Sequence, residues 1–175
     1  MTITLSGQRW MAVLFFVLTL SDARAQQDEK NTSTTTPVAT AEIDLPLPAA
    51  PKKENLLPFY VSATTTMNFA LDGQSVSVDS DGVVRYVVVV TSRAGATNTS
   101  YEGIRCPTGE KKLIALGQAD GSWSRARRDR WEPITEAGGN RQHAALALEY
   151  FCEGGRVAGK AETIVERLRR KKPLK

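Results

Sequence analysis

The sequence is poor in the side chains that most often bind metal ions. It contains one histidine, His143, and two cysteines, Cys106 and Cys152, among 175 residues. Zinc and most transition metals are held by several such ligands at defined spacings, and the sequence offers no second ligand pair with such a spacing. We therefore expect no metal site and no bound cofactor.

Long hydrophobic runs are also absent, apart from one near the N-terminus. Residues 11–20 are almost entirely apolar, Arg9 precedes them, and the small residues Ala23 and Ala25 follow. A transmembrane helix needs about 20 apolar residues, so this shorter run is typical of a secretory signal peptide. We predict a signal peptide over residues 1–25 that is cleaved after Ala25.

This prediction places the mature protein outside the cytoplasm. Because no cysteine stands at the cleavage point, we expect no lipid anchor but a soluble protein in a bacterial periplasm. Cys106 and Cys152 would then lie in an oxidising compartment, where paired thiols tend to form a disulfide. A bridge that closes a loop of about 46 residues stabilises a fold by ~4 kcal/mol in the chain-entropy model. Two free buried thiols are the alternative.

Composition divides the mature chain into three parts. Residues 26–51 are rich in Thr, Ala and Pro; such a segment buries too little apolar surface to fold, so we predict a disordered tether. Residues 52–170 are long enough for a single domain with one core. Residues 171–175 form a basic tail that continues a run of arginines.

The first half of the domain shows the pattern of an antiparallel sheet. We expect strands at residues 66–71, 75–78, 83–92, 97–106 and 111–116, separated by turns rich in Gly, Asp and Pro. Residues 83–92 are apolar on both faces apart from Arg85, which predicts a central strand covered on both sides. Residues 117–139 show no regular pattern.

Two helices are predicted in the second half. Asn140 can cap the first, which would end at Gly154 with Cys152 in its last turn, and the second spans residues 160–170. The expected buried faces are Ala144, Ala147, Leu148 and Phe151 in the first helix and Ala161, Ile164, Val165 and Leu168 in the second. The sequence thus predicts a single α+β domain: a twisted antiparallel β-meander of about five strands with two C-terminal helices packed on one face.

Several short motifs follow one another along this domain. They are Glu-Asn-Leu-Leu-Pro-Phe at 54–59, Gly-Val-Val-Arg-Tyr at 82–86, Ser-Tyr-Glu-Gly-Ile-Arg-Cys at 100–106, Asp-Gly-Ser-Trp at 120–123 and Tyr-Phe-Cys at 150–152. In this order they resemble the CNP-like family of bacterial envelope proteins, named for a cryptic neisserial protein, over residues 52–170. The resemblance implies export and brings no catalytic residues with it. Members often carry a lipid-anchoring cysteine at the cleavage site, which this chain lacks.

One cluster suited to binding mixes aromatic and basic residues. This candidate ligand surface consists of Trp123, Arg125, Arg127, Arg128, Arg130 and Trp131. Aromatic residues mixed with arginines can hold nucleic-acid bases, acidic sugars or phospholipid headgroups, and an envelope supplies lipid headgroups and acidic polymers. The alternative is that both tryptophans pack on the sheet while the arginines are solvated. The compartment disfavours nucleic acid, and we expect the basic tail to add only weak contact with a membrane face.

Motifs that could indicate catalysis are incomplete. Residues 154–160 fit a phosphate loop, but Ala161 stands where a Ser or Thr should follow. Asp79 and Asp81 begin a hairpin turn rather than a calcium loop, because the twelfth position is Val90. His143 has no Gly-x-Ser-x-Gly elbow to serve, and we expect it to be a partly exposed helix residue.

We therefore predict a non-catalytic binding or structural module, without catalytic residues, for an anionic envelope ligand or a protein partner. The alternative from another class is a hydrolase or transferase that acts on envelope polymers. The acids available in the middle of the chain for such an enzyme are Glu102, Glu110, Asp120, Asp129 and Glu132. Glu102 and Arg105 should face opposite sides of their strand, because their positions differ by three, an odd number.

Overall fold

The structure is a computed structural model that describes residues 46–128, 130–137 and 141–174. The predicted signal peptide, most of the predicted tether and Asn140 lie outside these residues. The elements are η1 (Lys53–Asn55), β1 (Leu56–Phe59), β2 (Asn68–Val78), β3 (Val83–Thr91), β4 (Thr97–Arg105), β5 (Glu110–Gly117), β6 (Trp123–Arg125), β7 (Glu132–Pro133), α1 (Arg141–Leu146), η3 (Ala147–Phe151), β8 (Cys152–Glu153), β9 (Arg156–Val157) and α2 (Ala161–Arg169).

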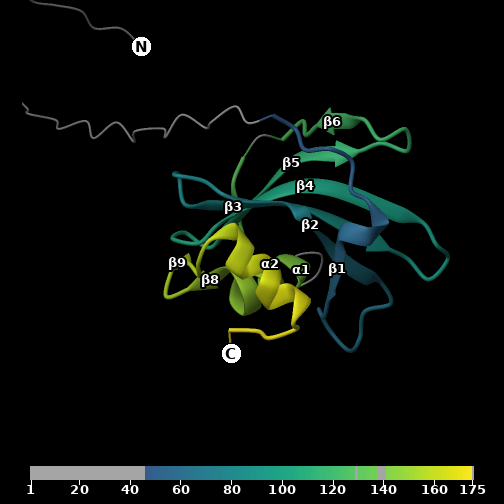
Figure 1. Cartoon of the computed structure of the whole chain (residues 1–175). Coiled ribbons are helices and arrows are strands. Elements are labelled where there is room, and N and C mark those ends of the chain that lie inside the picture. The colour runs from purple at the N-terminus through teal and green to yellow at the C-terminus, as the bar shows by residue number, and fades with distance from the viewer. Residues whose placement is uncertain (1–45, 129, 138–140, 175) are drawn as a thin grey trace, which may run out of the picture. The chain divides into compact units, whose positions relative to one another are not determined.

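The strands form an antiparallel meander. In the seven-stranded sheet, β1 to β6 lie side by side in sequence order, and β7 pairs with β5. Strands β8 and β9 form a separate two-stranded ribbon. Figure 1 shows α1 and α2 together on one side of the sheet. The predicted α+β domain, with a meander and two C-terminal helices on one face, is confirmed, and the sheet has more strands than expected.

Strand β3 lies between β2 and β4 and is buried on both faces, as predicted. Side chains alternate along a strand, so Val84 and Tyr86 face the helices while Val87 faces the other side, and all three are 0 % exposed. Covering both faces hides a β-branched segment that would promote aggregation if it were exposed.

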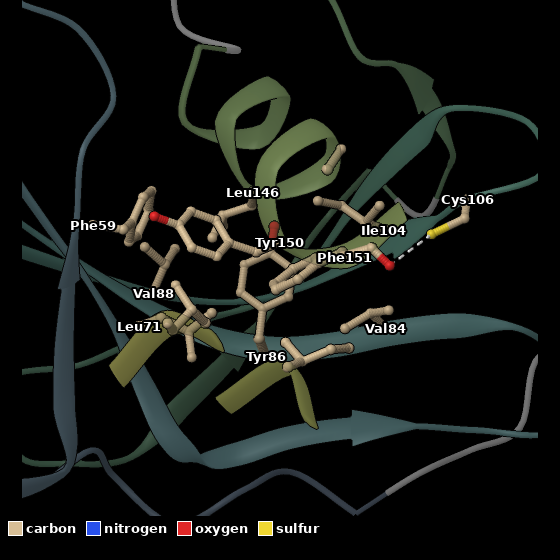
Figure 2. Packing of buried hydrophobic residues seen from close by; sticks show 13 residues of the cluster. Phe59, Leu71, Val84, Tyr86, Val88, Ile104, Cys106, Leu146, Tyr150 and Phe151 are labelled. Atoms are coloured by element: carbon tan, nitrogen blue, oxygen red, sulfur yellow. Dashed lines mark hydrogen bonds between the residues drawn. The ribbon is translucent and has the colours of Figure 1, made fainter. Parts of the chain in front are cut away.

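The main core lies between the sheet and the helical layer. Figure 2 shows Tyr86 of β3 beside Phe151 of η3, and the two rings meet edge to face with centroids 5.1 Å apart. Such pairs add about 0.5–1.5 kcal/mol beyond their buried area. From α2, Ile164 and Leu168 enter the same cluster, so the predicted apolar face of the second helix is the one that packs.

The opposite face of the sheet carries a smaller core. Val87, Tyr101 and Ala115 form its buried centre, and Leu47 and Trp123 pack against it. The indole N–H of Trp123 donates a hydrogen bond to the carbonyl oxygen of Pro48 at 2.7 Å. Packed structure therefore begins before residue 52, where we expected the domain to start.

Strand β2 differs from the prediction of two strands separated by a turn at Asp72. The chain continues through this point with a bulge between Asp72 and Ser77. Here side chains replace ladder hydrogen bonds: the Ser75 hydroxyl donates to the Asp72 carbonyl, and the Val87 amide donates to the Ser75 hydroxyl at 2.7 Å. Asp72 and Gly73 indicate a turn when only the sequence is considered, but in the structure they lie at a bulge.

Three short strands of the seven-stranded sheet were not predicted. Strand β1 contains Pro58, which lowers the strand signal, but β1 is an edge strand and so one side of it needs no ladder bonds. Strands β6 and β7 fall in the segment that we expected to be irregular. Each is at most three residues long, too short for any periodicity to show.

The first helix also differs from the prediction. After Leu146 the chain winds as a π-helix, η3, and Cys152 begins strand β8 instead of occupying a helical last turn. The wider π turn changes the direction in which successive side chains point. Leu148 is therefore 47 % exposed, although the other residues of its predicted face are buried. Gly154 and Gly155 form the β8–β9 turn, where their φ angles of 56° and 74° favour glycine.

Candidate functional site

A disulfide joins Cys106, at the end of β4, to Cys152, at the start of β8, with Cα atoms 5.5 Å apart. The bridge ties the sheet to the segment that follows η3. The Cys106 sulfur also lies 3.7 Å from the carbonyl oxygen of Phe151 (Figure 2). The predicted pairing is thus present in the structure, although Cys152 lies on a strand and not in a helix.

A buried polar cluster connects the sheet to α1. The two oxygens of Glu102 accept hydrogen bonds from three side chains: Ser100 at 2.7 Å, Tyr86 at 3.1 Å and His143 Nε2 at 2.8 Å. Glu102 is 6 % exposed and His143 is 4 % exposed. The expectation that His143 is partly exposed was wrong, because it faces the sheet and pairs with a buried carboxylate.

The charges of this cluster follow from its hydrogen bonds. Burial alone would raise the pKa of Glu102, but the bonds from His143, Ser100 and Tyr86 outweigh it and hold this pKa below its ordinary value. Burial and the neighbouring carboxylate raise the pKa of Tyr86 well above its ordinary range. The cluster therefore contains an ionised glutamate and a neutral tyrosine at neutral pH.

The cluster does not have the geometry of a serine hydrolase. Ser100 donates to Glu102 and not to His143, and the Nδ1 atom of His143 is buried with no hydrogen-bond partner among the described side chains. A catalytic serine needs the histidine as its base. The cluster instead holds α1 against β3 and β4.

The turn before β3 is organised by Arg85. This side chain, 2 % exposed, donates to Asp79 at 2.7 Å and to Asp81 at 2.5 Å. Burial would raise the pKa of Asp81, but Arg85 and the Val83 amide lower it overall. Both aspartates thus neutralise a buried arginine.

The tryptophans of the candidate ligand surface pack on the sheet. Trp123 lies 6.3 Å from the Tyr101 ring, centroid to centroid. Trp131 lies over Gly103, where a Cβ atom would come within 3.2 Å of the indole. The Arg105 guanidinium stacks on Trp131, 4.0 Å from the ring centroid, so Glu102 and Arg105 do face opposite sides of β4. Both tryptophans therefore pack on the sheet, which is the alternative that we gave for them.

The arginines of the candidate ligand surface meet at a pocket. It has a volume of about 430 Å³ and lies beside β5 and β6. Its charged lining consists of Lys111, Arg125, Arg127, Arg128, Arg130 and Glu132. Glu132 accepts from Lys111 at 3.3 Å and from Arg130 at 3.2 Å, and these two bonds lower the pKa of Glu132. We refer to this cavity as the basic pocket.

Leu113 and Leu116 of β5 add an apolar side to the basic pocket. The four arginines of this pocket were predicted from the sequence, but the leucines and Lys111 were missed because they lie in the strand before the cluster. The sequence places Leu113 and Leu116 shortly before the first of these arginines, whereas the 45 % exposure of Leu116 is a property of the structure.

Three of the cations near the C-terminus have structural partners. Arg167 donates to the carbonyl oxygens of Tyr150 at 2.6 Å and Ala158 at 2.9 Å. Arg169 and Arg170 both pair with Glu166. The Leu174 amide donates to the Glu149 carbonyl oxygen at 2.7 Å, so the tail follows η3 over the residues that the structure covers.

Two features are absent from the described residues. They contain no group of His, Cys, Asp or Glu side chains arranged to hold a metal ion. Within the same ranges, no helix is long and apolar enough to cross a membrane.

Comparison with known proteins places this arrangement in a family. The profile of the CNP1-like family matches residues 36–169, a range that contains the sheet, the disulfide and both helices. The chain belongs to the CNP1-like family. The family match begins before residue 46, so it includes the segment that packs on Trp123.

A curated relative agrees with this assignment. Cryptic neisserial protein 1 of Neisseria gonorrhoeae is 32 % identical over 111 residues, which cover 57 % of this chain and 54 % of the relative. The chain thus spans about half the length of that protein. No solved structure matches significantly.

Proposed function

We propose that this CNP1-like protein is an exported, periplasmic envelope protein whose domain binds an anionic envelope ligand in the basic pocket without catalysis. The N-terminal signal sequence and the disulfide support export, since stable disulfides belong to oxidising compartments. The observation that carries the binding proposal is the composition of the pocket: among its described lining residues, five are basic and one, Glu132, is acidic.

The single acid also bears on the enzymatic alternative. Hydrolysis of polymers by acid–base chemistry commonly uses two carboxyl groups that flank the bond to be cleaved. In the basic pocket Glu132 is the only carboxylate among the described lining residues, and it pairs with Lys111 and Arg130. Glu102 is buried with both oxygens bonded. Both observations favour binding over hydrolysis.

Binding to anionic vesicles tests the proposal. The mature chain should bind phosphatidylglycerol vesicles and not phosphatidylcholine vesicles, with an affinity that falls steeply as salt rises. Arg127→Ser/Arg128→Ser should weaken binding about 30-fold, from ~1 kcal/mol for each cation. Arg93→Ser/Arg156→Ser removes the same charge from exposed positions elsewhere and should have little effect.

Two results would contradict the binding proposal. One is equal binding by both double variants, which would mean that net charge and not the pocket attracts the ligand. The other is an affinity that does not change with salt. If vesicles do not bind and cross-linking in cells captures one protein reproducibly, the domain is instead an assembly module for a protein partner.

Export is tested separately by the N-terminus of the protein in cells. Mass spectrometry of the intact protein from a periplasmic extract should give a chain that begins at Gln26, after cleavage at Ala25. A chain that retains Met1 in the cytoplasmic fraction would refute export.

A further inference from the structure

We propose that the ligand of the basic pocket is a single anionic amphiphile: a phosphate-bearing lipid whose headgroup meets the arginines and whose acyl chain covers the leucines of β5. This inference rests on the proposed function and specifies its ligand. It concerns one lipid molecule held in a pocket rather than the surface of a bilayer.

The apolar side of the pocket results from a bulge in β5. Tyr101 pairs with Ala115 and Glu102 pairs with Leu113, so Ile114 is an extra residue at this point. In a regular strand Leu113 and Leu116 would face opposite sides, because their positions differ by three, an odd number. The extra residue places both leucines on the face that carries Glu102 and Ser100. The bulge thus creates a pair of leucines beside the arginines.

These leucines are not part of the main core that packs between the sheet and the helices. Leu116 is one of the few large apolar side chains with substantial exposure, at 45 %. Both leucines line the basic pocket, whereas the helical residues of the main core do not. Burying such a side chain under a hydrocarbon chain is favourable, because it removes apolar surface from water.

The polar side of the pocket suits a phosphate. Arg127 and Arg128 are exposed at its rim, and arginine donates paired hydrogen bonds to phosphate oxygens. Lys111 and Arg130 are held in place by Glu132. Exposed cations and cations paired with Glu132 therefore surround a site next to an apolar wall, which is the arrangement that an anionic headgroup with a chain requires.

The volume of the basic pocket favours one lipid molecule over other anionic occupants. A volume of about 430 Å³ lies near the lower end of the range of ~300–1,000 Å³ that holds small ligands. Free phosphate would leave the leucines exposed, and a bilayer would contact a flat surface instead of filling a cavity. One headgroup with the first part of its chain matches both the volume and the lining.

The test varies chain length at constant charge. Affinities of the mature chain are measured for monomeric glycerol phosphate, dibutanoyl phosphatidic acid and dihexanoyl phosphatidic acid. Affinity should rise with chain length by about fourfold for each methylene that becomes buried. Dihexanoyl phosphatidylcholine, which has the same chains and no net charge, should bind much more weakly.

Paired leucine variants locate the chain. Leu116→Ser should remove most of the dependence on chain length and leave binding of glycerol phosphate unchanged. Leu148→Ser is the matched control, because Leu148 is 47 % exposed on η3, outside this pocket. It should behave as the wild type. Arg127→Ser/Arg128→Ser should weaken all the phosphates.

The outcomes separate the two proposals. Equal affinity for glycerol phosphate and dihexanoyl phosphatidic acid overturns the lipid inference and leaves the anionic site. Binding to vesicles without binding to any monomeric lipid also overturns it, in favour of surface docking. Failure to bind any phosphate or anionic vesicle refutes the proposed function itself.

Discussion

At the scale of single residues, Glu102 shows how one buried charge can be kept in a core. A buried carboxylate is costly unless hydrogen bonds replace its water. Here those bonds come from Tyr86 of β3, Ser100 of β4 and His143 of α1. The sheet and the helical layer are therefore joined by charge-assisted hydrogen bonds as well as by apolar packing.

Replacing Glu102 by Gln tests this account. Glu102→Gln should lower the free energy of unfolding at neutral pH by ~2 kcal/mol, because charge-assisted bonds become neutral ones. Urea denaturation at a series of pH values measures the effect. Glu153→Gln, at an exposed position, is the control and should be neutral.

The pH dependence has a definite sign. Because the folded pKa of Glu102 is lowered, its contribution is present above the pKa of the unfolded chain, about 4.3, and is lost as pH falls through the folded pKa. The wild type should therefore lose more stability than Glu102→Gln below about pH 4.5. Parallel curves would show that Glu102 carries no charge in the fold.

Arg167 is a second residue whose partners only the structure reveals. It lies in the run of arginines before the basic tail, and it donates hydrogen bonds to the carbonyl oxygens of Tyr150 and Ala158. Arg167→Ala should cost ~2 kcal/mol in urea denaturation, as expected for lost hydrogen bonds to a charged group. Arg169→Ala removes an exposed cation of the same helix and should cost under ~0.5 kcal/mol. Equal costs would contradict the structural role.

At the scale of elements, the end of α2 shows a C-terminal motif without glycine. Lys171 has a φ of 51°, its amide donates to the Leu168 carbonyl, and the Lys172 amide donates to the Arg167 carbonyl. This is the Schellman pattern, which favours glycine at the left-handed position. The motif turns the chain back towards η3.

Replacing this lysine should stabilise the protein. Lys171→Gly should raise the free energy of unfolding by ~0.5–1 kcal/mol, because glycine adopts positive φ without steric strain. Lys172→Gly, one residue later and without a positive φ among the residues described, should be neutral or destabilising. Thermal denaturation of both variants measures the difference, and an order opposite to this one would argue against the motif.

The disulfide acts between elements, joining the end of β4 to β8 across a sequence separation of 46. Cys106→Ala/Cys152→Ala should lower the free energy of unfolding by ~4 kcal/mol in the chain-entropy model. Denaturation of the wild type with and without reductant gives an independent value. A stability unchanged by reduction would show that the thiols are not bonded in the isolated protein.

At the scale of the whole molecule, the sheet is covered on both faces by different means. The helices cover one face, and the segment from Leu47 to Pro48 covers part of the other through Trp123. Leu47→Ser should therefore cost ~1–2 kcal/mol in urea denaturation, since it exposes part of the smaller core. Ala49→Ser, at an exposed site of the same segment, should be neutral. Equal effects would mean that the segment does not pack in solution.

The sequence by itself determined the larger elements. Strands β3, β4 and β5 and helix α2 lie within a residue or two of their predicted ranges, because each is long enough for periodicity and flanking turns to act locally. The pairing of two cysteines followed from their number and the expected compartment. The arginines of the candidate ligand surface were likewise visible as a cluster.

Only the tertiary structure decided features that depend on distant partners. The bulge in β2 depends on bonds between Ser75 and β3, and the burial of His143 depends on Glu102. The exposure of Leu116 depends on how β5 pairs with β4, and the packed position of Trp123 depends on Pro48. None of these partners is close in sequence, so local patterns could not reveal them. The basic pocket exists because folding places the leucines of β5 beside arginines that follow them in the chain.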